Sequence, residues 1–218
     1  MGKTDGRKWV DLGLPSGRKW AMCNIGAEDD EDDYLGMEEY GSYFAWGDVK
    51  GDPYAGSKQS GYRRSFDWGN YSLCNGSQDT INKYCSVDGQ GVIIDNKMIL
   101  DTEDDPATVL WGSSWKTPSY EDFLELKKEC EWSFEKIYSV NGALVKGKNG
   151  QCIFLPAAGF RLDDGLWYDG FDGNYWTSSL YKEAAHVAWN CYINFRQKEV
   201  ELACNFRRLG LSIRPVLK

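Results

Sequence analysis

The segment TPSYEDFLELKKEC, residues 117–130, carries the strongest helix signal in the chain. Ser119 and Asp122 have the spacing of a capping box, in which a hydroxyl and a carboxylate satisfy free amides at a helix N-terminus. The apolar residues that follow share one face of such a helix: Phe123, Leu124, Leu126 and Cys130. We therefore expect an amphipathic helix that ends near Cys130 and packs on a core.

The sequence before this helix predicts further short elements. Asp105 is suited to cap a second helix, with Pro106 at its first position and Gly112 at its end. A helix is also expected at residues 38–46, EEYGSYFAW, because the aromatic residues have amphipathic spacing before a glycine. Near the N-terminus, WVDLGL and KWAMC flank a Pro-Ser-Gly turn, which predicts two short strands at residues 9–14 and 19–23.

The sequence after residue 130 favours β structure. Residues 143–146 and 151–155 flank a turn bounded by glycines, which predicts a hairpin. Residues 187–195 alternate as a half-buried strand does, with these on one face: Trp189, Cys191 and Ile193. After a polar turn the alternation resumes with Val200, Leu202 and Cys204. Residues 212–216 predict a final strand.

Composition sets further bounds. A chain of 218 residues is within what one hydrophobic core supports, so we expect a single domain spanning residues 1–218. Ten Trp, 13 Tyr and 9 Phe beside 24 Gly predict a core of large rings joined by tight turns. Residues 47–99 show little periodicity and are expected to form long loops, pinned by Trp68, Tyr71 and Tyr84.

The charge pattern excludes some partners. The formal net charge of −8 argues against a nucleic acid partner, because phosphate binding needs a basic surface. No apolar run is long enough to span a bilayer, and the first residues lack the apolar stretch of a signal peptide, although a removed leader stays open. The acidic runs at residues 28–33 and 101–105 are expected to be solvated loops rather than a structural calcium site.

Cysteine and histidine usage gives no metal or catalytic motif. The seven cysteines are an odd number without a C-x-x-C pair, and the chain has one histidine, so no zinc site and no cofactor are expected. Two interpretations of the cysteines stay open, free thiols or one or two disulfides. The seven residues are Cys23, Cys74, Cys85, Cys130, Cys152, Cys191 and Cys204. His186 has no serine or cysteine motif around it that would indicate a catalytic triad.

Six ordered segments carry a family resemblance: VDLGLPSG at 10–17, YFAWGD at 43–48, WGSSWKTPSYEDFLEL at 111–126, IFLPAAGFR at 153–161, NYWTSSL at 174–180 and SIRPV at 212–216. They resemble the Fibrobacter succinogenes major paralogous domain, which is common in gut Bacteroidetes. The resemblance covers nearly the whole chain and is weakest at about residues 51–94. It implies an α+β, C-type lectin-like fold with two short helices, small antiparallel sheets, long loops, and paired N- and C-terminal strands.

The same group includes variable proteins of diversity-generating retroelements, which are receptors whose C-terminal codons are mutated at template adenines. Mutation of the adenines in an Asn codon can produce codons for Phe, Tyr, His, Arg, Leu, Val or Ala, which we call reachable residues, but never for Trp, Glu, Gln, Lys or Met. Reachable residues in the C-terminal region, together with Tyr168, form the candidate binding surface that the resemblance implies: Tyr168, Tyr181, His186, Val187, Tyr192, Phe195, Arg196, Ala203, Phe206, Arg208, Leu209 and Leu211. The alternative interpretation places Val187, Phe206 and Leu211 in the core.

Two rival sites follow from the same resemblance. Formylglycine-generating enzymes share the distant fold and hold copper with two cysteines, a role for which Cys191 and Cys204 are the candidates because alternation places both on an inward face. The surrounding sequence lacks the context of that active site, and we expect no enzymatic activity. Calcium-dependent lectins use Glu-Pro-Asn or Gln-Pro-Asp loops, which are missing here. Sugar stacking on Trp167 or Tyr168 without calcium stays open.

The sequence therefore predicts a binding module with a diversified C-terminal surface rather than an enzyme. Its expected partner is a protein or glycan receptor on another cell or virion, and its expected location is a cell surface or a virion. Exposed Tyr, Phe and Arg side chains supply the contacts that dominate binding interfaces. The alternative is a surface module of the same fold that binds carbohydrate or protein without diversification.

Overall fold

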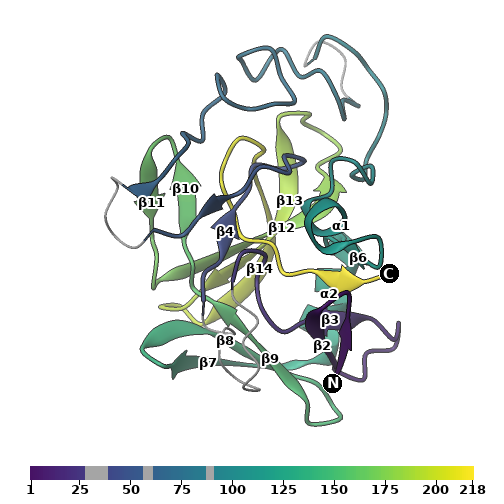
Figure 1. Ribbon diagram of the computed structural model, residues 1–218, viewed down its shortest axis with the longest axis vertical. Helices are drawn as coiled ribbons and strands as arrows, with labels where there is room; N and C mark the ends of the chain where they lie inside the picture. The colour runs from purple at the N-terminus through teal and green to yellow at the C-terminus, as the bar shows by residue number, and fades with distance from the viewer. Residues whose placement is uncertain (28–38, 56–60, 87–90) are drawn as a thin grey trace.

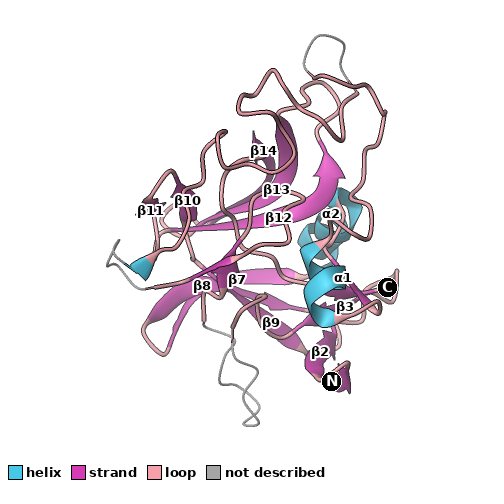
Figure 2. Ribbon diagram, turned by 45° about the horizontal axis from the view of Figure 1, so that its top comes forward, coloured by secondary structure: helices cyan, strands magenta, loops and turns pink. Residues whose placement is uncertain are grey.

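The computed structural model describes residues 1–27, 39–55, 61–86 and 91–218 (Figure 1). In these residues the chain is an α+β fold of small antiparallel sheets with two helices, α1 (Pro106–Trp111) and α2 (Tyr120–Glu129). Asp105 caps α1, and Ser119 forms the capping box of α2 with its carboxylate partner three residues later. The two helix predictions that rested on capping residues are confirmed. Helix α1 lies beside β6 (Trp115–Lys116), and α2 lies beside β12 (Asp172–Leu180) (Figure 2).

The two ends of the described chain meet in one five-stranded sheet with the order β1-β2-β3-β15-β6. Its strands are β1 (Gly2–Thr4), β2 (Arg7–Asp11), β3 (Lys19–Ala21), β6 (Trp115–Lys116) and β15 (Val216–Leu217). The last strand pairs with β3 and β6, not with β1, because Val216 lies opposite both Trp20 and Lys116. The expected strand at 212–216 is displaced toward the C-terminus, since Pro215 has no N–H to donate to a ladder.

Four further sheets, two of two strands and two of three strands, complete the described fold. They comprise β4 (Ser42–Tyr43) with β5 (Asp52–Pro53), β7 (Glu131–Ile137) with β8 (Val140–Lys146) and β9 (Cys152–Pro156), β10 (Phe160–Leu162) with β11 (Gly165–Trp167), and β12 (Asp172–Leu180) with β13 (Val187–Asn194) and β14 (Glu199–Phe206). Lys146 lies opposite Cys152, which confirms the hairpin expected at residues 143–155. The sheet of β12, β13 and β14 is the scaffold on which the candidate site is built.

The prediction of a helix at residues 38–46 is wrong for the part that the structure describes, residues 39–46. The segment is extended there and includes β4, while residue 38 lies outside the described residues. Phe44 and Trp46 enter one core cluster, and Tyr43 and Ala45 enter another. Alternation between two cores has a period of two, so the apolar run indicates an extended segment buried on both faces.

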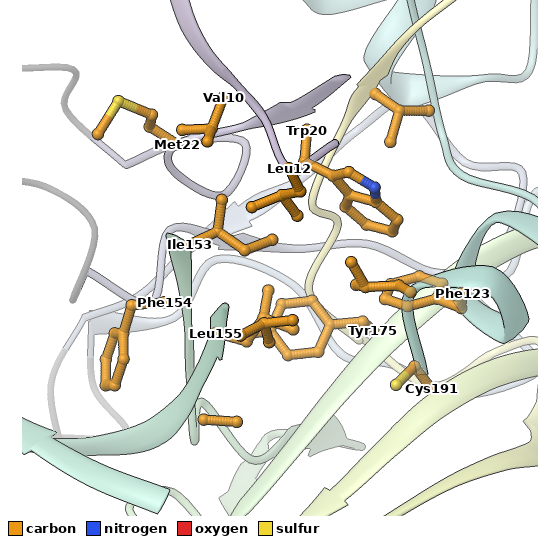
Figure 3. Packing of buried hydrophobic residues seen from close by; sticks show 14 of the residues in the cluster. Val10, Leu12, Trp20, Met22, Phe123, Ile153, Phe154, Leu155, Tyr175 and Cys191 are labelled. Atoms are coloured by element: carbon orange, nitrogen blue, oxygen red, sulfur yellow. The ribbon is translucent and has the colours of Figure 1, made fainter. Parts of the chain in front are cut away.

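The core around α2 is made of large rings and branched side chains (Figure 3). Trp20 meets Phe123 edge to face, with ring centroids 4.9 Å apart. From the sheet beneath, Tyr175 and Cys191 point into the same cluster. This packing fixes one face of β12 and β13 and directs the alternate side chains to the opposite face.

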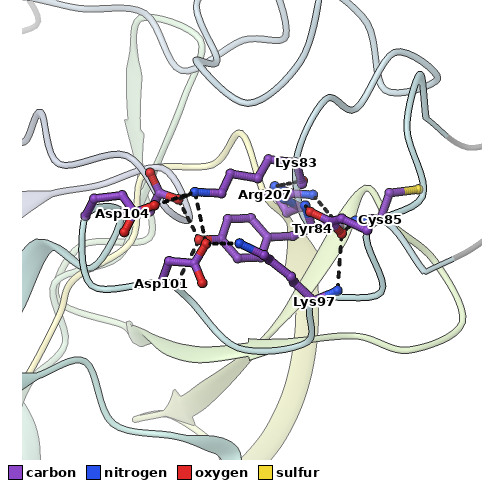
Figure 4. A network of polar contacts seen from close by, with 9 residues as sticks. Lys83, Tyr84, Cys85, Lys97, Asp101, Asp104 and Arg207 are labelled. Carbon is purple, nitrogen blue, oxygen red and sulfur yellow. Dashed lines mark hydrogen bonds and ion pairs between the residues drawn. The ribbon is translucent and has the colours of Figure 1, made fainter.

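Three fully buried arginines join distant segments. Arg161 forms an ion pair with Asp52, with 2.9 Å between Nη1 and Oδ2, and Arg214 donates to the side chain of Asn24 and to backbone carbonyls. Arg207 donates to four groups in or beside the long segment before α1, shown in part in Figure 4. Long loops were predicted for residues 47–99, and β5 is the only strand in the described part of that range. Tyr71 and Tyr84 are buried as predicted, and Trp68 is half-buried.

Candidate functional site

A hollow of about 550 Å³ lies over one face of β12, β13 and β14, and we call it the amide hollow. Its floor comes from the three strands: Asp172, Asn174, Tyr192, Asn194 and Asn205. Its rim comes from β10, from the connection between β11 and β12, and from the turn after β13: Phe160, Tyr168, Phe171, Arg196 and Gln197. Three of the predicted binding residues, Tyr168, Tyr192 and Arg196, therefore meet at one concave site.

Strand register explains why polar groups gather on this floor. Asp172 lies opposite Asn194, and Asn174 lies opposite Tyr192, so the four side chains share one face of the sheet. The alternate residues of β13, Cys191 and Ile193, belong to the core on the opposite face. The alternation predicted for residues 187–195 is confirmed, and the face of Asn190, Tyr192 and Asn194 carries the site. At the start of the strand, Ala188 of this face is buried in another core cluster.

An amide ladder crosses the three strands. Nδ2 of Asn205 donates to Oδ1 of Asn190 at 3.4 Å, and Nδ2 of Asn190 donates to Oδ1 of Asn174 at 3.3 Å. Asn174 is only 2% exposed, yet its own Nδ2 has no hydrogen-bond partner among the described residues. A buried unsatisfied donor of this kind costs about 1–3 kcal/mol. The ladder therefore ends in a buried donor, which belongs to a residue that lines the hollow.

The charged groups of the hollow are close to balance. The guanidinium carbon of Arg196 lies 3.9 Å from the ring centroid of Phe171. Burial raises the pKa of the Asp172 carboxyl, and the hydrogen bond from Tyr192 and the charge of Arg196 only partly oppose it. Burial, followed by the charge of Asp172, raises the pKa of the Tyr192 phenol, so this hydroxyl stays protonated near neutral pH. The floor offers hydroxyl and amide hydrogen bonds rather than an activated nucleophile.

Tyr168 is held at the rim in a strained and exposed position. Its side chain is 57% exposed, and its φ of 57° is in the left-handed region that bulky residues avoid. The Tyr168 carbonyl accepts the backbone amides of Phe171 at 3.0 Å and Asp172 at 2.9 Å, and its ring stacks on Phe160. Strain of this kind, kept at an exposed aromatic residue beside a hollow, is typical of binding and active sites.

A second accessible group lies where β13 begins and β14 ends, and we call it the Phe206 cluster: Trp68, His186, Phe206 and Arg208. Phe206 is 42% exposed, stacks on His186 with centroids 5.7 Å apart, and meets Trp68 edge to face at 6.3 Å. The guanidinium of Arg208 lies 5.9 Å from both the Trp68 and the Phe206 rings. Phe206 is therefore outside the core, contrary to the alternative interpretation.

The other predicted site residues are dispersed. Tyr181 packs on Trp189, Phe195 packs on Phe134, and Val187 and Ala203 are half-buried. Two assignments are wrong as contact residues, because Leu209 is 6% exposed and Leu211 is 0% exposed. After β14 the chain turns back into the molecule, where both leucines join the cluster around Trp176 and Leu211 exchanges backbone hydrogen bonds with Phe44.

The sequence reasoning missed several residues of the amide hollow. They are the rim residues Phe160, Phe171 and Gln197 and the floor and ladder residues Asp172, Asn174, Asn190, Asn194 and Asn205. A signal for part of the floor was present, because Asn190 and Asn194 lie on the non-core face of a strand whose other face is apolar. The contribution of β12 and β10 depends on strand pairing, which alternation within one segment does not reveal.

The rival cysteine site is not assembled as the sequence suggested. Cys191 is buried, and burial raises the pKa of its thiol to about 12. Cys204 is exposed, so its expected inward position is wrong. Val200 and Leu202 pack on the core cluster, whereas Cys204 lies farther along β14 and is not part of that cluster. The structure joins none of the seven cysteines to another by a disulfide.

The acidic run that precedes α1 is neutralised by lysine. The carboxylates of Asp101, Glu103 and Asp104 approach within 4.8 Å of one another, and the ammonium of Lys83 contacts all three (Figure 4 shows Asp101 and Asp104). Lys97 adds a second ion pair to Asp101. The Lys83 ammonium therefore already lies among the carboxylates that a metal cation would need as ligands. The other acidic run, residues 28–33, lies outside the described residues.

None of the helices in the described ranges is long and apolar enough to cross a membrane. No family model, curated protein or solved structure matched the chain.

Proposed function

We propose that this chain is a non-enzymatic binding module whose contact surface is carried by β12, β13, β14 and the loops beside them. The observation that supports this most is the gathering of accessible aromatic, amide and guanidinium groups in the amide hollow and the Phe206 cluster, on strands whose opposite face is fixed by the core. Rigid aromatic residues and arginine are the side chains that dominate binding energy in protein interfaces. The partner would be a protein or glycan receptor, and the module would act at a cell surface or on a virion.

The proposal includes a C-type lectin-like architecture. It is supported by the shared sheet of the chain ends, by the two short helices, and by long connections with little regular structure before α1. An experimental structure superposed on C-type lectin-like domains would test it. A different strand order around β15 would refute this assignment of the fold.

We also propose that accessible positions of this surface are diversified by a retroelement. Phe206 and Arg208 could change without opening the core, whereas a polar residue at Leu211 would be buried without a partner. Sequencing the flanking DNA should reveal a reverse transcriptase gene and a near-copy of the C-terminal codons, with variation concentrated at accessible positions. A flanking region without both features would favour the alternative, a module with a fixed surface.

The binding function can be tested with the fluorescently labelled chain on a panel of intact bacterial cells, measured by flow cytometry. Tyr192→Ala and Phe206→Ala should each abolish most of the binding to cells that the unchanged chain labels. Each change should cost about 1 kcal/mol or less in the free energy of unfolding, because both side chains are partly accessible. Val109→Ala, which shortens an exposed apolar side chain of α1, is the matched control and should leave binding unchanged.

Two outcomes would contradict the proposal. Cell binding that survives both substitutions would place the contact surface elsewhere. A loss of several kcal/mol in either variant would show that the side chain stabilises the core rather than contacts a partner.

A further inference from the structure

We propose that the amide hollow is a calcium-independent site for a neutral sugar ring, such as the terminal hexose of a glycan. This inference rests on the proposed binding function and names the ligand class of one of its two clusters. Its starting point is the unsatisfied donor of Asn174 at the floor of the hollow.

The amide ladder fixes the direction in which that donor is offered. Because Oδ1 of Asn174 accepts from Asn190, and Asn190 in turn accepts from Asn205, the Nδ2 end of Asn174 is left as the free end of the ladder. That amide is almost wholly covered in this structure, so its side chain must turn toward the hollow for a sugar hydroxyl to accept this hydrogen bond. The same hydroxyl can then donate to a neighbouring group. Binding would therefore remove the cost of the unsatisfied donor, which an apolar ligand could not do.

The rim supplies the apolar half of the site. Tyr168 and Phe171 are both exposed large aromatic side chains beside the polar floor, and Tyr168 is the main wall because Arg196 covers one face of the Phe171 ring. The C–H face of a sugar ring packs against such rings, with weak C–H contacts adding to the buried apolar area. A concave site with aromatic walls and a few directed polar groups is the usual form of a small-ligand pocket. The hollow of about 550 Å³ has room for one or two rings.

The charges favour a neutral ligand and oppose calcium. Asp172 and Arg196 supply one group of each sign, and the guanidinium already lies over Phe171. Calcium takes six to eight oxygen ligands and prefers several carboxylates, whereas Asp172 is the only carboxylate among the residues that line the hollow. A phosphate or sulfate would have to lie beside Asp172. A neutral polyhydroxyl ring matches the donors and acceptors without either penalty.

The test uses an array of neutral oligosaccharides with terminal hexose, deoxyhexose or N-acetylhexosamine, probed with the full chain in EDTA. The array saccharide that binds best is then titrated by calorimetry into two variants. Asn174→Asp keeps the acceptor for Asn190 but removes the free donor, and Tyr168→Gly removes the rim ring while relieving the positive φ. Each variant should bind at least about tenfold more weakly.

Tyr138→Gly is the matched control, because Tyr138 is also an exposed aromatic residue at positive φ, lies in the turn between β7 and β8, and does not line the hollow. It should bind the saccharide as the unchanged chain does. Tyr168→Gly should keep or raise the thermal midpoint, so a loss of binding there cannot be ascribed to unfolding. This holds even if the buried carboxylate of Asn174→Asp impairs folding.

The inference is overturned if no array saccharide binds in EDTA, if binding appears only when calcium is added, or if Tyr168→Gly binds as tightly as the unchanged chain. Its failure is distinguishable from failure of the proposed function. Binding to intact cells that is lost in Phe206→Ala, without any saccharide binding, would leave the binding module standing and remove the sugar site.

Discussion

Replacing Arg207 with Met should destabilise the protein more than truncating the accessible side chains Tyr192 and Phe206 of the candidate site. The guanidinium is fully buried and donates through Nε to the hydroxyl of Tyr71 at 2.8 Å. Through its other nitrogens it donates to the carbonyls of Lys83, Tyr84 and Ala185 at 2.9 to 3.1 Å. One side chain thus holds the loops before α1 against the end of β14.

The magnitude follows from what Met would leave behind. Met occupies much of the space of the arginine stem but donates nothing, so three carbonyls and one hydroxyl would lose a buried, charge-assisted donor. Leaving a buried acceptor without a donor costs about 1–3 kcal/mol, and four neutral acceptors are affected here. We expect a loss of about 4 kcal/mol, at the low end of their sum because the change also removes a buried charge. For a chain of this length, each kcal/mol lowers the thermal midpoint by about 2–4 °C, so a decrease on the order of 10 °C is expected.

The assay is thermal and urea unfolding followed by tryptophan fluorescence, with Arg208→Met as the control. Arg208 is the next residue and has the same chemistry, but its side chain is partly accessible to solvent, and its ion-pair partner Asp163 is exposed. Its substitution should cost about 1 kcal/mol or less. Equal losses in the two variants, or a loss below about 1 kcal/mol for Arg207→Met, would refute the reasoning that burial and the four hydrogen bonds set the cost.

Two further changes test other parts of the structure. Burial would raise the pKa of Asp122, but the backbone hydrogen bond from Ser119 and two nearby cations together lower it. The ionised carboxylate therefore stabilises the fold at pH values above the unfolded-state pKa of about 3.9. This stabilisation is lost as the pH falls through the lower pKa of the folded state. Asp122→Asn should therefore unfold about 1–2 kcal/mol more easily in urea at pH 7, with the difference shrinking at acid pH, and a constant difference would contradict the assignment. A thiol reagent applied to the native chain should modify exposed Cys204 well before buried Cys191, whose thiol pKa is raised to about 12, as peptide mass mapping would show. Equal labelling of the two under native conditions would mean that β13 opens readily.

Local sequence signals predicted the elements whose cause is local. Both confirmed helices begin at capping residues, and the hairpin of β8 and β9 follows from the glycines that bound its turn. The two faces of β13 follow from alternation within one strand. In each case the residues that determine the structure are within a few positions of one another.

The errors concern features that depend on distant segments. Residues 39–46 are extended because two separate core clusters lie on either side of them, which amphipathic spacing could not reveal. Arg207 and Arg208 are identical neighbours in sequence, and only the loops around them decide that the first is buried and the second half-buried. The sequence placed candidate contact residues on β13 and β14, and Tyr192 of β13 does line the amide hollow, while the Asn174 amide, which comes from β12, required the pairing of three strands.

The position of β15 between β3 and β6 has a consequence for how the chain folds. Two residues near the C-terminal end fill the middle of a sheet whose neighbouring strands come from near residue 20 and residue 115. Closing so large a loop costs entropy before any contact repays it, and such topologies form slowly. Until that closure, Trp20 and Trp115 lack their neighbour in the sheet, so the folding chain leaves aromatic surface uncovered until residues 216 and 217 are in place.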